Sequence, residues 1–156
     1  HEVDSICQVS YMDEEQREEF LEEFEREREK SLVAFCVMGG IFSEGIDLTE
    51  DKLIGAVIAG TGIPQVCTER EILKQYFNAA DMDGFDYAYL YPGMNKVLQS
   101  AGRVIRTESD RGVILLLDDR FREMRYREVF PREWQQYQLG SVKNLEQEIR
   151  TFWESP

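Results

Sequence analysis

Residues 31–48 of this chain, SLVAFCVMGGIFSEGIDL, join an apolar run to a turn that is rich in glycine. The first eight of these residues are almost continuously apolar, which is typical of a strand that lies inside a parallel sheet and is buried on both faces. Residues 53–59 and 112–117 have the same character. Helical patterns separate these runs. Alternating strands and helices joined by short loops predict an α/β fold, a three-layer α/β/α sandwich on a mainly parallel sheet.

The predicted helices begin and end at ordinary helix signals. Asp13 is a good N-cap for a helix that continues to about residue 30. A second helix is expected over residues 68–80. A third helical pattern, over residues 85–105, must be bent or interrupted at Pro92, because proline lacks the N–H group that an α-helix bonds. Each of these helices follows or precedes an apolar run, as the α/β prediction requires.

Length and composition limit the class of protein. A chain of 156 residues with 42% hydrophobic residues predicts a single domain over residues 1–156, and we expect it to be a fragment of a longer protein. No apolar run approaches the roughly 20 residues of a membrane span, so no membrane partner is expected. The three cysteines, Cys7, Cys36 and Cys67, are widely spaced, and there is one histidine. We therefore expect no metal site, a core position for Cys36 and a reducing, cytoplasmic setting.

The net charge of −13 argues against general coating of nucleic acid, but it is unevenly distributed. Residues 1–100 carry 21 acidic and 8 basic side chains, whereas residues 101–156 carry 10 of each. The basic side chains of the second part are mostly arginines that begin at Arg103. Any site for a polyanion is therefore expected near these arginines, on a locally positive surface of an acidic domain.

The first segment that suggests chemistry follows the strand predicted over residues 31–38. In parallel sheets of this kind, ligands bind at the carboxyl ends of the strands. Gly39, Gly40 and Gly45 let backbone N–H groups approach a phosphate oxygen, and Ser43 adds a hydroxyl group. Asp47 could accept a hydrogen bond from a ribose or orient an arginine. A glycine-rich turn whose aspartate caps the next segment explains these residues equally well.

The second segment contains a glutamine and two arginines at helical spacing. On a helix, Gln99, Arg103 and Arg106 share one face, and Gly102 removes a side chain beside them. Two arginines and an amide that converge on one point form a good clamp for phosphoryl oxygens. Ordinary surface salt bridges are the alternative for each arginine taken alone.

These two segments carry a resemblance to a known family. Motif V of superfamily 2 helicases resembles residues 39–48, GGIFSEGIDL, and motif VI resembles residues 99–106, QSAGRVIR. The sequences of both motifs are similar to those of the DinG/XPD-like branch. Residues 85–99, FDYAYLYPGMNKVLQ, and residues 112–121, GVILLLDDRF, also resemble that branch. The resemblance extends from about residue 13 to residue 130. It implies a RecA-like domain, the second and C-terminal motor domain of an ATP-dependent DNA helicase.

In such helicases two RecA-like domains close around ATP, and a single DNA strand lies across both. The resemblance implies that Arg106 is the arginine finger that reaches the γ-phosphate. Arg103 and Gln99 would support that contact, and Gly45 and Asp47 would lie near the ribose. A supplied arginine accelerates hydrolysis by about 10³–10⁵ in other NTPases.

The resemblance also implies where DNA and the other parts of the motor lie. Gly39, Gly40 and Ser43 would face the DNA backbone, and Glu44 would link the DNA and ATP sites. ATP and Mg²⁺ would be bound mainly by the missing N-terminal motor domain, since no G-x-x-x-x-G-K-[ST] motif occurs in this chain. Some family members carry an iron–sulfur cluster in that first domain. We expect this fragment alone to be inactive and its parent to serve DNA repair or replication.

The sequence also allows two other interpretations. Asp118 and Asp119 follow a strand as a Walker B aspartate does, but without a P-loop we expect Asp119 and Arg120 to fix the strand end or an interdomain contact. The chain could also be a catalytically silent nucleic-acid-binding or interaction module with a helicase-like fold. That module would use a strip of arginines with interleaved aromatics: Arg120, Phe121, Arg122, Arg125, Tyr126, Arg127, Phe130 and Arg132. The simpler alternative is that the aromatics are core residues and the arginines pair with Glu123, Glu128 and Glu133.

Overall fold

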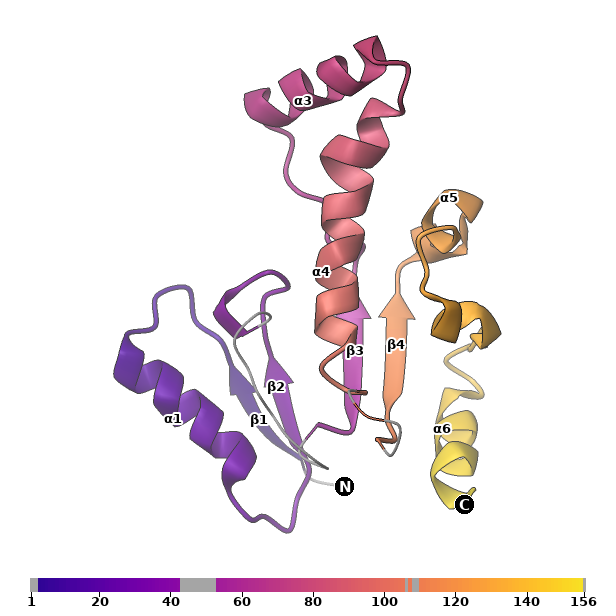
Figure 1. Cartoon of the computed structure of the whole chain (residues 1–156). Coiled ribbons are helices and arrows are strands. Elements are labelled where there is room, and N and C mark those ends of the chain that lie inside the picture. Colours follow the sequence, from indigo (N-terminus) through magenta and orange to yellow (C-terminus); the bar gives the residue numbers. More distant parts are fainter. Residues whose placement is uncertain (1–2, 43–52, 106, 108–109, 156) are drawn as a thin grey trace.

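The computed structural model describes residues 3–42, 53–105, 107 and 110–155. It has an α/β architecture with four parallel strands (Figure 1). The strands are β1 (Asp4–Cys7), β2 (Leu32–Phe35), β3 (Gly55–Ala59) and β4 (Val113–Leu117). The α-helices are α1 (Glu14–Glu25), α3 (Thr68–Ala79), α4 (Tyr91–Ala101), α5 (Met124–Arg127) and α6 (Leu145–Glu154). A π-helix, η2 (Asp86–Leu90), and two 3₁₀ helices, η3 (Asp119–Arg122) and η4 (Arg132–Gln136), complete the described elements.

The four strands form two parallel pairs. β1 pairs with β2, and β3 pairs with β4 in the register that joins Gly55 to Val113 and Ala59 to Leu117. Figure 1 shows the arrowheads of all four strands pointing to the same end of the molecule. The carboxyl ends of the strands therefore lie on one side, where the sequence predicts the candidate site. The prediction of an α/β fold with parallel strands is confirmed.

One face of each strand pair carries a helix. α1 begins at the predicted N-cap, where the Asp13 side chain accepts a hydrogen bond from the Gln16 backbone N–H at 2.9 Å. Its Phe20 is buried against the β1–β2 pair and stacks on Phe42 with ring centroids 4.2 Å apart. α4 covers the β3–β4 pair and buries Ile58 in the larger of the two core clusters. Each strand pair thus has a hydrophobic core on its helix-covered side.

The expectation that these strands are buried on both faces is wrong for β2 and β3. Side chains along β2 alternate between half-buried and exposed, and Phe35 is 59% exposed. Val57 of β3 is 63% exposed. A strand with one covered face produces this alternation, because successive side chains point to opposite faces. Cys36, expected in the core, is also exposed, since it follows the end of β2.

The third predicted helix is interrupted and consists of η2 followed by α4. Residues 68–90, from the start of α3 to the end of η2, form an arm that projects from the body (Figure 1). Pro92 has no N–H group, so the Ala88 carbonyl, four residues earlier, cannot accept its usual helical bond. Arg70 of α3 donates to that carbonyl at 2.6 Å instead. The interruption predicted at Pro92 is thus present as the π-helix η2, which directly precedes α4.

The N-terminal part of α4 is fixed to the residues after β3 by close backbone packing at Gly93. A methyl group at Gly93 would meet the Thr61 carbonyl oxygen at 2.8 Å and the Ile63 nitrogen at 2.9 Å. Only glycine leaves room for this approach, since backbone atoms cannot move aside cheaply. The contact fixes the height of α4 above the sheet and thereby places the side chains farther along the helix.

Candidate nucleotide and DNA site

The glycine-rich turn directly follows β2. The Gly40 backbone N–H donates to the Val37 carbonyl at 2.9 Å, which closes a four-residue turn. Gly39, the third residue of this turn, has a φ of +76°. A side chain at that position would be strained, so glycine is required there. The turn lies at the carboxyl end of the strand, as the sequence predicts for a ligand site.

The second predicted segment differs from its predicted form. Gln99 is exposed on the last turn of α4, but the helix ends at Ala101 and Gly102 is its C-cap. The Arg103 N–H donates to the Ser100 carbonyl at 3.4 Å, in a turn rather than in the helix. The expectation that Gln99 and Arg103 share a continuous helical face is therefore wrong. Gly102 ends the helix, and Arg103 lies in the turn that follows it.

The structure brings the two segments together through α4. The Lys96 side chain lies against Gly39, and a methyl group at Gly39 would meet Lys96 Cδ at 2.9 Å and Cε at 3.0 Å. Lys96 is three residues before Gln99, so the two side chains are neighbours on the helix surface. The glycine turn and the end of α4 therefore form one continuous surface. Sequence reasoning missed Lys96, and the signal that could have found it is a lysine one helical turn before motif VI.

A second residue missed by sequence reasoning borders the turn on its other side. Gln8, just beyond the end of β1, accepts a hydrogen bond from the Val37 N–H through its Oε1 at 2.9 Å. Its Nε2 lies 3.0 Å from the position that a methyl group at Gly40 would occupy. Gln8 thus braces the turn from the neighbouring strand. Only the pairing of β1 with β2 brings the two residues together.

Several predicted site residues lie outside the described part of the chain. These are Ser43, Glu44, Gly45, Asp47 and Arg106. The predicted contacts of Arg106 with a γ-phosphate and of Asp47 with a ribose therefore remain predictions. The residues that the structure does place are Gly39, Gly40, Gln99 and Arg103.

The aspartate that follows β4 is engaged in the fold. Asp118 caps η3 by accepting from the Arg120 backbone N–H at 3.0 Å. The Arg120 guanidinium donates to both of its carboxylate oxygens, at 2.9 and 2.8 Å. These hydrogen bonds hold the pKa of Asp118 below its usual range. Arg120 thus fixes the strand end as predicted, but its partner there is Asp118 and not the predicted Asp119.

The fold engages the aromatics and two arginines of the strip that supports the silent-module interpretation, whereas Arg122, Arg127 and Arg132 are exposed. The three aromatics, Phe121, Tyr126 and Phe130, are buried in the larger core cluster. Arg125 pairs with Asp83 and Asp86. The simpler interpretation is thus confirmed for the aromatics. For Arg125, however, the acidic partners are aspartates of the arm rather than nearby glutamates.

Two general findings concern other kinds of site. Across residues 3–42, 53–105, 107 and 110–155, no group of three or more His, Cys, Asp or Glu side chains could hold a metal ion. In the same part of the chain, no helix has both the length and the apolar character needed to cross a membrane.

Comparison with known proteins shows that the chain is similar to helicases. The family model described as a helicase C-terminal domain matches residues 1–137. A probable ATP-dependent helicase of Methanocaldococcus jannaschii is 30% identical over 105 residues, which cover 62% of this chain and 16% of that protein. The ATP-dependent DNA helicase DinG of Photobacterium profundum is 36% identical over 89 residues, which cover 56% of this chain and 13% of DinG.

Two further similarities involve XPD. The XPD helicase subunit of the general transcription and DNA repair factor IIH of Schizosaccharomyces pombe is 30% identical over 125 residues, covering 74% of this chain and 15% of the subunit. A solved XPD helicase structure matches with a TM-score of 0.62 and 20% identity, covering 81% of this chain and 23% of that chain. This structural match indicates the RecA-like fold. The chain spans only 13% to 16% of the length of these three relatives.

Proposed function

Because this chain belongs to the helicase C-terminal domain family, in its DinG/XPD-like branch, we propose that it acts as the second motor domain of an ATP-dependent DNA helicase. ATP and Mg²⁺ are held mainly by a first motor domain in the same parent protein. Arg106 supplies the arginine finger to the γ-phosphate, with Arg103 and Gln99 in support. Gly39, Gly40, Ser43 and Glu44 grip single-stranded DNA, and Gly45 and Asp47 lie near the nucleotide.

The observation that supports this proposal most strongly is the contact between the glycine turn and α4. The turn proposed to grip DNA lies against Lys96, and the end of the same helix carries Gln99 and leads into Arg103. A shift of α4 on ATP hydrolysis would therefore move the turn as well. A motor needs this kind of coupling between its nucleotide site and its grip on the strand, and domain closure provides the movement.

The chemical role of Arg106 follows from phosphoryl transfer. Negative charge spreads over the γ-phosphate oxygens in the transition state, and a fixed guanidinium stabilises that charge. Opening of the two motor domains after hydrolysis removes the guanidinium and relaxes the grip. Successive closing and opening then advances the strand along the turn.

The test is ATP hydrolysis by the full-length parent protein, with and without single-stranded DNA. We expect Arg106→Ala to lower DNA-stimulated turnover by well over a hundredfold, within the roughly 10³–10⁵ range of arginine fingers. Arg150→Ala is the matched control, because Arg150 is an exposed arginine of α6 that pairs with Glu146. Its turnover should equal that of the wild type.

Two outcomes would count against the motor. Unchanged turnover in Arg106→Ala would mean that this arginine is not the finger. A wild-type parent without any DNA-stimulated turnover would favour the catalytically silent nucleic-acid-binding module instead.

A further inference from the structure

The Lys96 side chain is held across the glycine turn rather than extended freely into solvent. Its Cδ, Cε and Nζ atoms lie 2.9, 3.0 and 3.4 Å from the position that a methyl group at Gly39 would occupy. A long side chain that already rests on a surface loses less conformational entropy when its ammonium group binds a ligand. Gly39 therefore serves two purposes, since it permits the positive φ and makes room for the lysine.

The ammonium group of Lys96 can donate hydrogen bonds to an anion. Within the described residues it forms no ion pair, whereas Lys74 of the arm pairs with Glu71 at 3.4 Å. Lys96 is only half-buried, so its Nζ remains accessible. Gly39 itself has no side chain, so the backbone of the turn lies close to the ammonium group. A cation beside an open glycine turn is a common arrangement for binding a phosphate.

On the other side of the turn lies an open hollow of about 370 Å³. It begins beside Gly40, since both Gln8 and Ile41 line it, and it extends toward the start of α1. The hollow is lined by Gln8, Ser10, Tyr11, Met12, Asp13, Gln16, Arg17 and Ile41. Its lining mixes amides, a hydroxyl group, an aromatic ring and aliphatic groups with one carboxylate, Asp13, and one guanidinium, Arg17. It thus offers both hydrogen-bonding groups and apolar surface.

The charges around the hollow decide which part of a nucleotide it suits. Its far wall is the N-terminus of α1, where Asp13 is followed by Glu14 and Glu15. These three carboxylates outnumber the single guanidinium of Arg17 and oppose a phosphate at that end. The ring of Tyr11 is 94% exposed and offers a face on which a base can stack. A neutral base fits the hollow better than a phosphate does, whereas the phosphate fits Lys96.

We propose that Lys96 binds a backbone phosphate of single-stranded DNA at the Gly39 turn, and that the hollow beside Gln8 and Tyr11 receives a neighbouring base. This inference rests on the proposed function, because it places the strand on the turn that grips DNA. A single strand is required, since the bases of a duplex are paired and stacked inside it. The contacts read no base identity, because a phosphate and a stacking face are common to all nucleotides.

The test measures binding of a fluorescent oligothymidylate by the full-length parent protein over a series of salt concentrations. Loss of one phosphate contact on a single strand should reduce the salt slope by about 0.7. We expect Lys96→Gln to weaken binding about three- to tenfold at low salt and to show this smaller slope. Lys96→Arg should restore the wild-type slope, which a purely structural role of the lysine would not predict.

Two further variants separate the base from the phosphate and provide a control. Tyr11→Ala should weaken binding roughly fivefold or more without changing the salt slope, because it removes stacking and no charge. Lys143→Gln removes an exposed lysine just before α6 and should bind as the wild type does. ATP hydrolysis in the absence of DNA should be the same in Lys143→Gln as in the wild type.

The outcomes distinguish this inference from the proposed function. A wild-type slope in Lys96→Gln, in a parent protein that does bind the oligonucleotide, overturns the phosphate contact at Lys96 and leaves the motor intact. Unchanged affinity in Tyr11→Ala overturns the base site in the hollow. A wild-type protein that binds no single-stranded DNA overturns the proposed function together with this inference.

Discussion

At the scale of single residues, the arm is held by a hydrogen bond between Tyr89 and Glu71. The buried Tyr89 hydroxyl donates to Glu71 Oε1 at 2.7 Å and joins η2 to α3. This hydrogen bond is the main reason that the pKa of Tyr89 is raised to about 12. It also lowers the pKa of Glu71. The bond therefore exists in full only while the phenol keeps its proton.

The raised pKa of Tyr89 predicts how stability depends on alkaline pH. A group whose pKa is raised by folding stabilises the protein fully below its unfolded pKa, near 10, and loses that contribution as pH rises through the folded value. We expect wild type to be more stable than Tyr89→Phe by a constant margin from neutral pH up to about pH 10. The margin should shrink progressively toward pH 12. Chemical denaturation at a series of pH values measures it.

The matched control is Tyr76→Phe, which changes a 66% exposed tyrosine of α3, the helix that carries Glu71. Its stability should follow that of the wild type at every pH in the series. A margin between wild type and Tyr89→Phe that stays constant through pH 12 would mean that Glu71 does not hold the phenolic proton.

At the scale of elements, the junction between η2 and α4 depends on α3. Pro92 deprives the Ala88 carbonyl of its helical partner, and Arg70 replaces that partner from across the arm. We expect Arg70→Ala to lower the free energy of unfolding by about 1–3 kcal/mol, because it leaves a buried carbonyl without a hydrogen bond. Urea denaturation of the parent protein or of this chain measures the loss.

Lys74→Ala is the control, because Lys74 lies on α3 as Arg70 does but does not bond the Ala88 carbonyl. Lys74 forms only a partly exposed ion pair with Glu71, so its removal should cost less than about 1 kcal/mol. Equal losses in the two variants would show that the Arg70 contact contributes nothing beyond an ordinary surface interaction.

Local sequence patterns predicted the elements whose ends depend on local chemistry. The N-cap at Asp13 and the start of α3 at Thr68 agree with the structure. The contact of Arg70 with the Ala88 carbonyl at η2 could not be predicted, because it joins two helices that are apart in sequence. The exposed face of β2 was also missed, since an apolar run is compatible with one or two covered faces.

The same distinction applies to the candidate site. The motifs identified Gly39 and Gln99 from glycine content and spacing. They did not identify Lys96 or Gln8, because the role of each depends on which turn its side chain meets in space. The end of α4 at Gly102 could have been predicted, since glycine commonly ends a helix. Motif spacing favoured a continuous helix instead.

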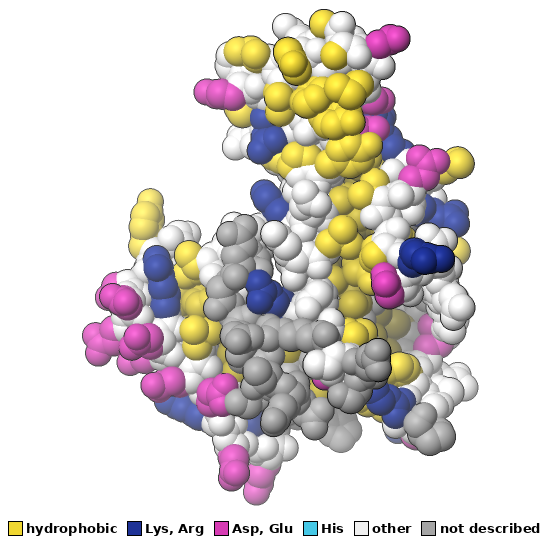
Figure 2. Space-filling view, in the orientation of Figure 1, with side chains coloured by type: hydrophobic (Ala, Val, Ile, Leu, Met, Phe, Trp, Pro, Cys, Tyr) yellow, Lys and Arg dark blue, Asp and Glu magenta, His cyan; other side chains and the backbone are white. Residues whose placement is uncertain are grey.

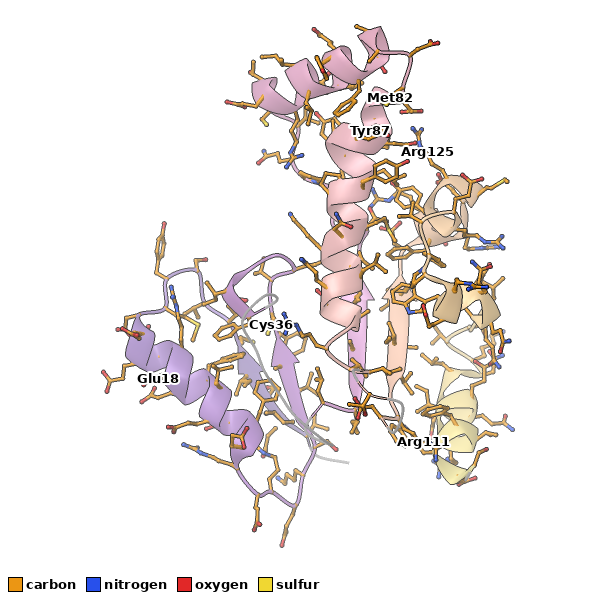
Figure 3. All side chains as sticks on the ribbon, viewed as in Figure 1. Glu18, Cys36, Met82, Tyr87, Arg111 and Arg125 are labelled. Atoms are coloured by element: carbon orange, nitrogen blue, oxygen red, sulfur yellow. The ribbon has the colours of Figure 1, made fainter. Side chains whose placement is uncertain are left out.

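At the scale of the whole molecule, the arm is joined to the C-terminal part of the body through Arg125. Figure 3 shows Arg125 between the arm and α5. Its guanidinium lies 2.6 Å from both Asp83 and Asp86 and 4.8 Å from the centre of the Phe85 ring. Hydrophobic side chains also gather over the arm in the space-filling view (Figure 2). Arg125 thus ties a projecting element to the core that contains β4.

We expect Arg125→Ala to loosen the arm without unfolding the body. The side chain is 40% exposed, so the loss should be about 1 kcal/mol or less. Hydrogen exchange should become faster by up to about fivefold in residues 83–91 and stay unchanged in β3 and β4. Arg127→Ala is the control, since Arg127 of the same helix contacts Tyr137 and not the arm. Faster exchange in both variants would contradict a specific tie.

The pairing of β3 with β4 also constrains the order in which the chain assembles. All of α3, η2 and α4 lies between Gly55 and Val113, which the pairing brings together. During synthesis β3 leaves the ribosome long before its partner strand, and an unpaired apolar strand invites aggregation. α4 emerges in the interval and buries Ile58 against itself. Packing of α4 therefore covers one face of β3 before β4 is synthesised. Formation of the helix also shortens the loop that is closed when β4 pairs with β3.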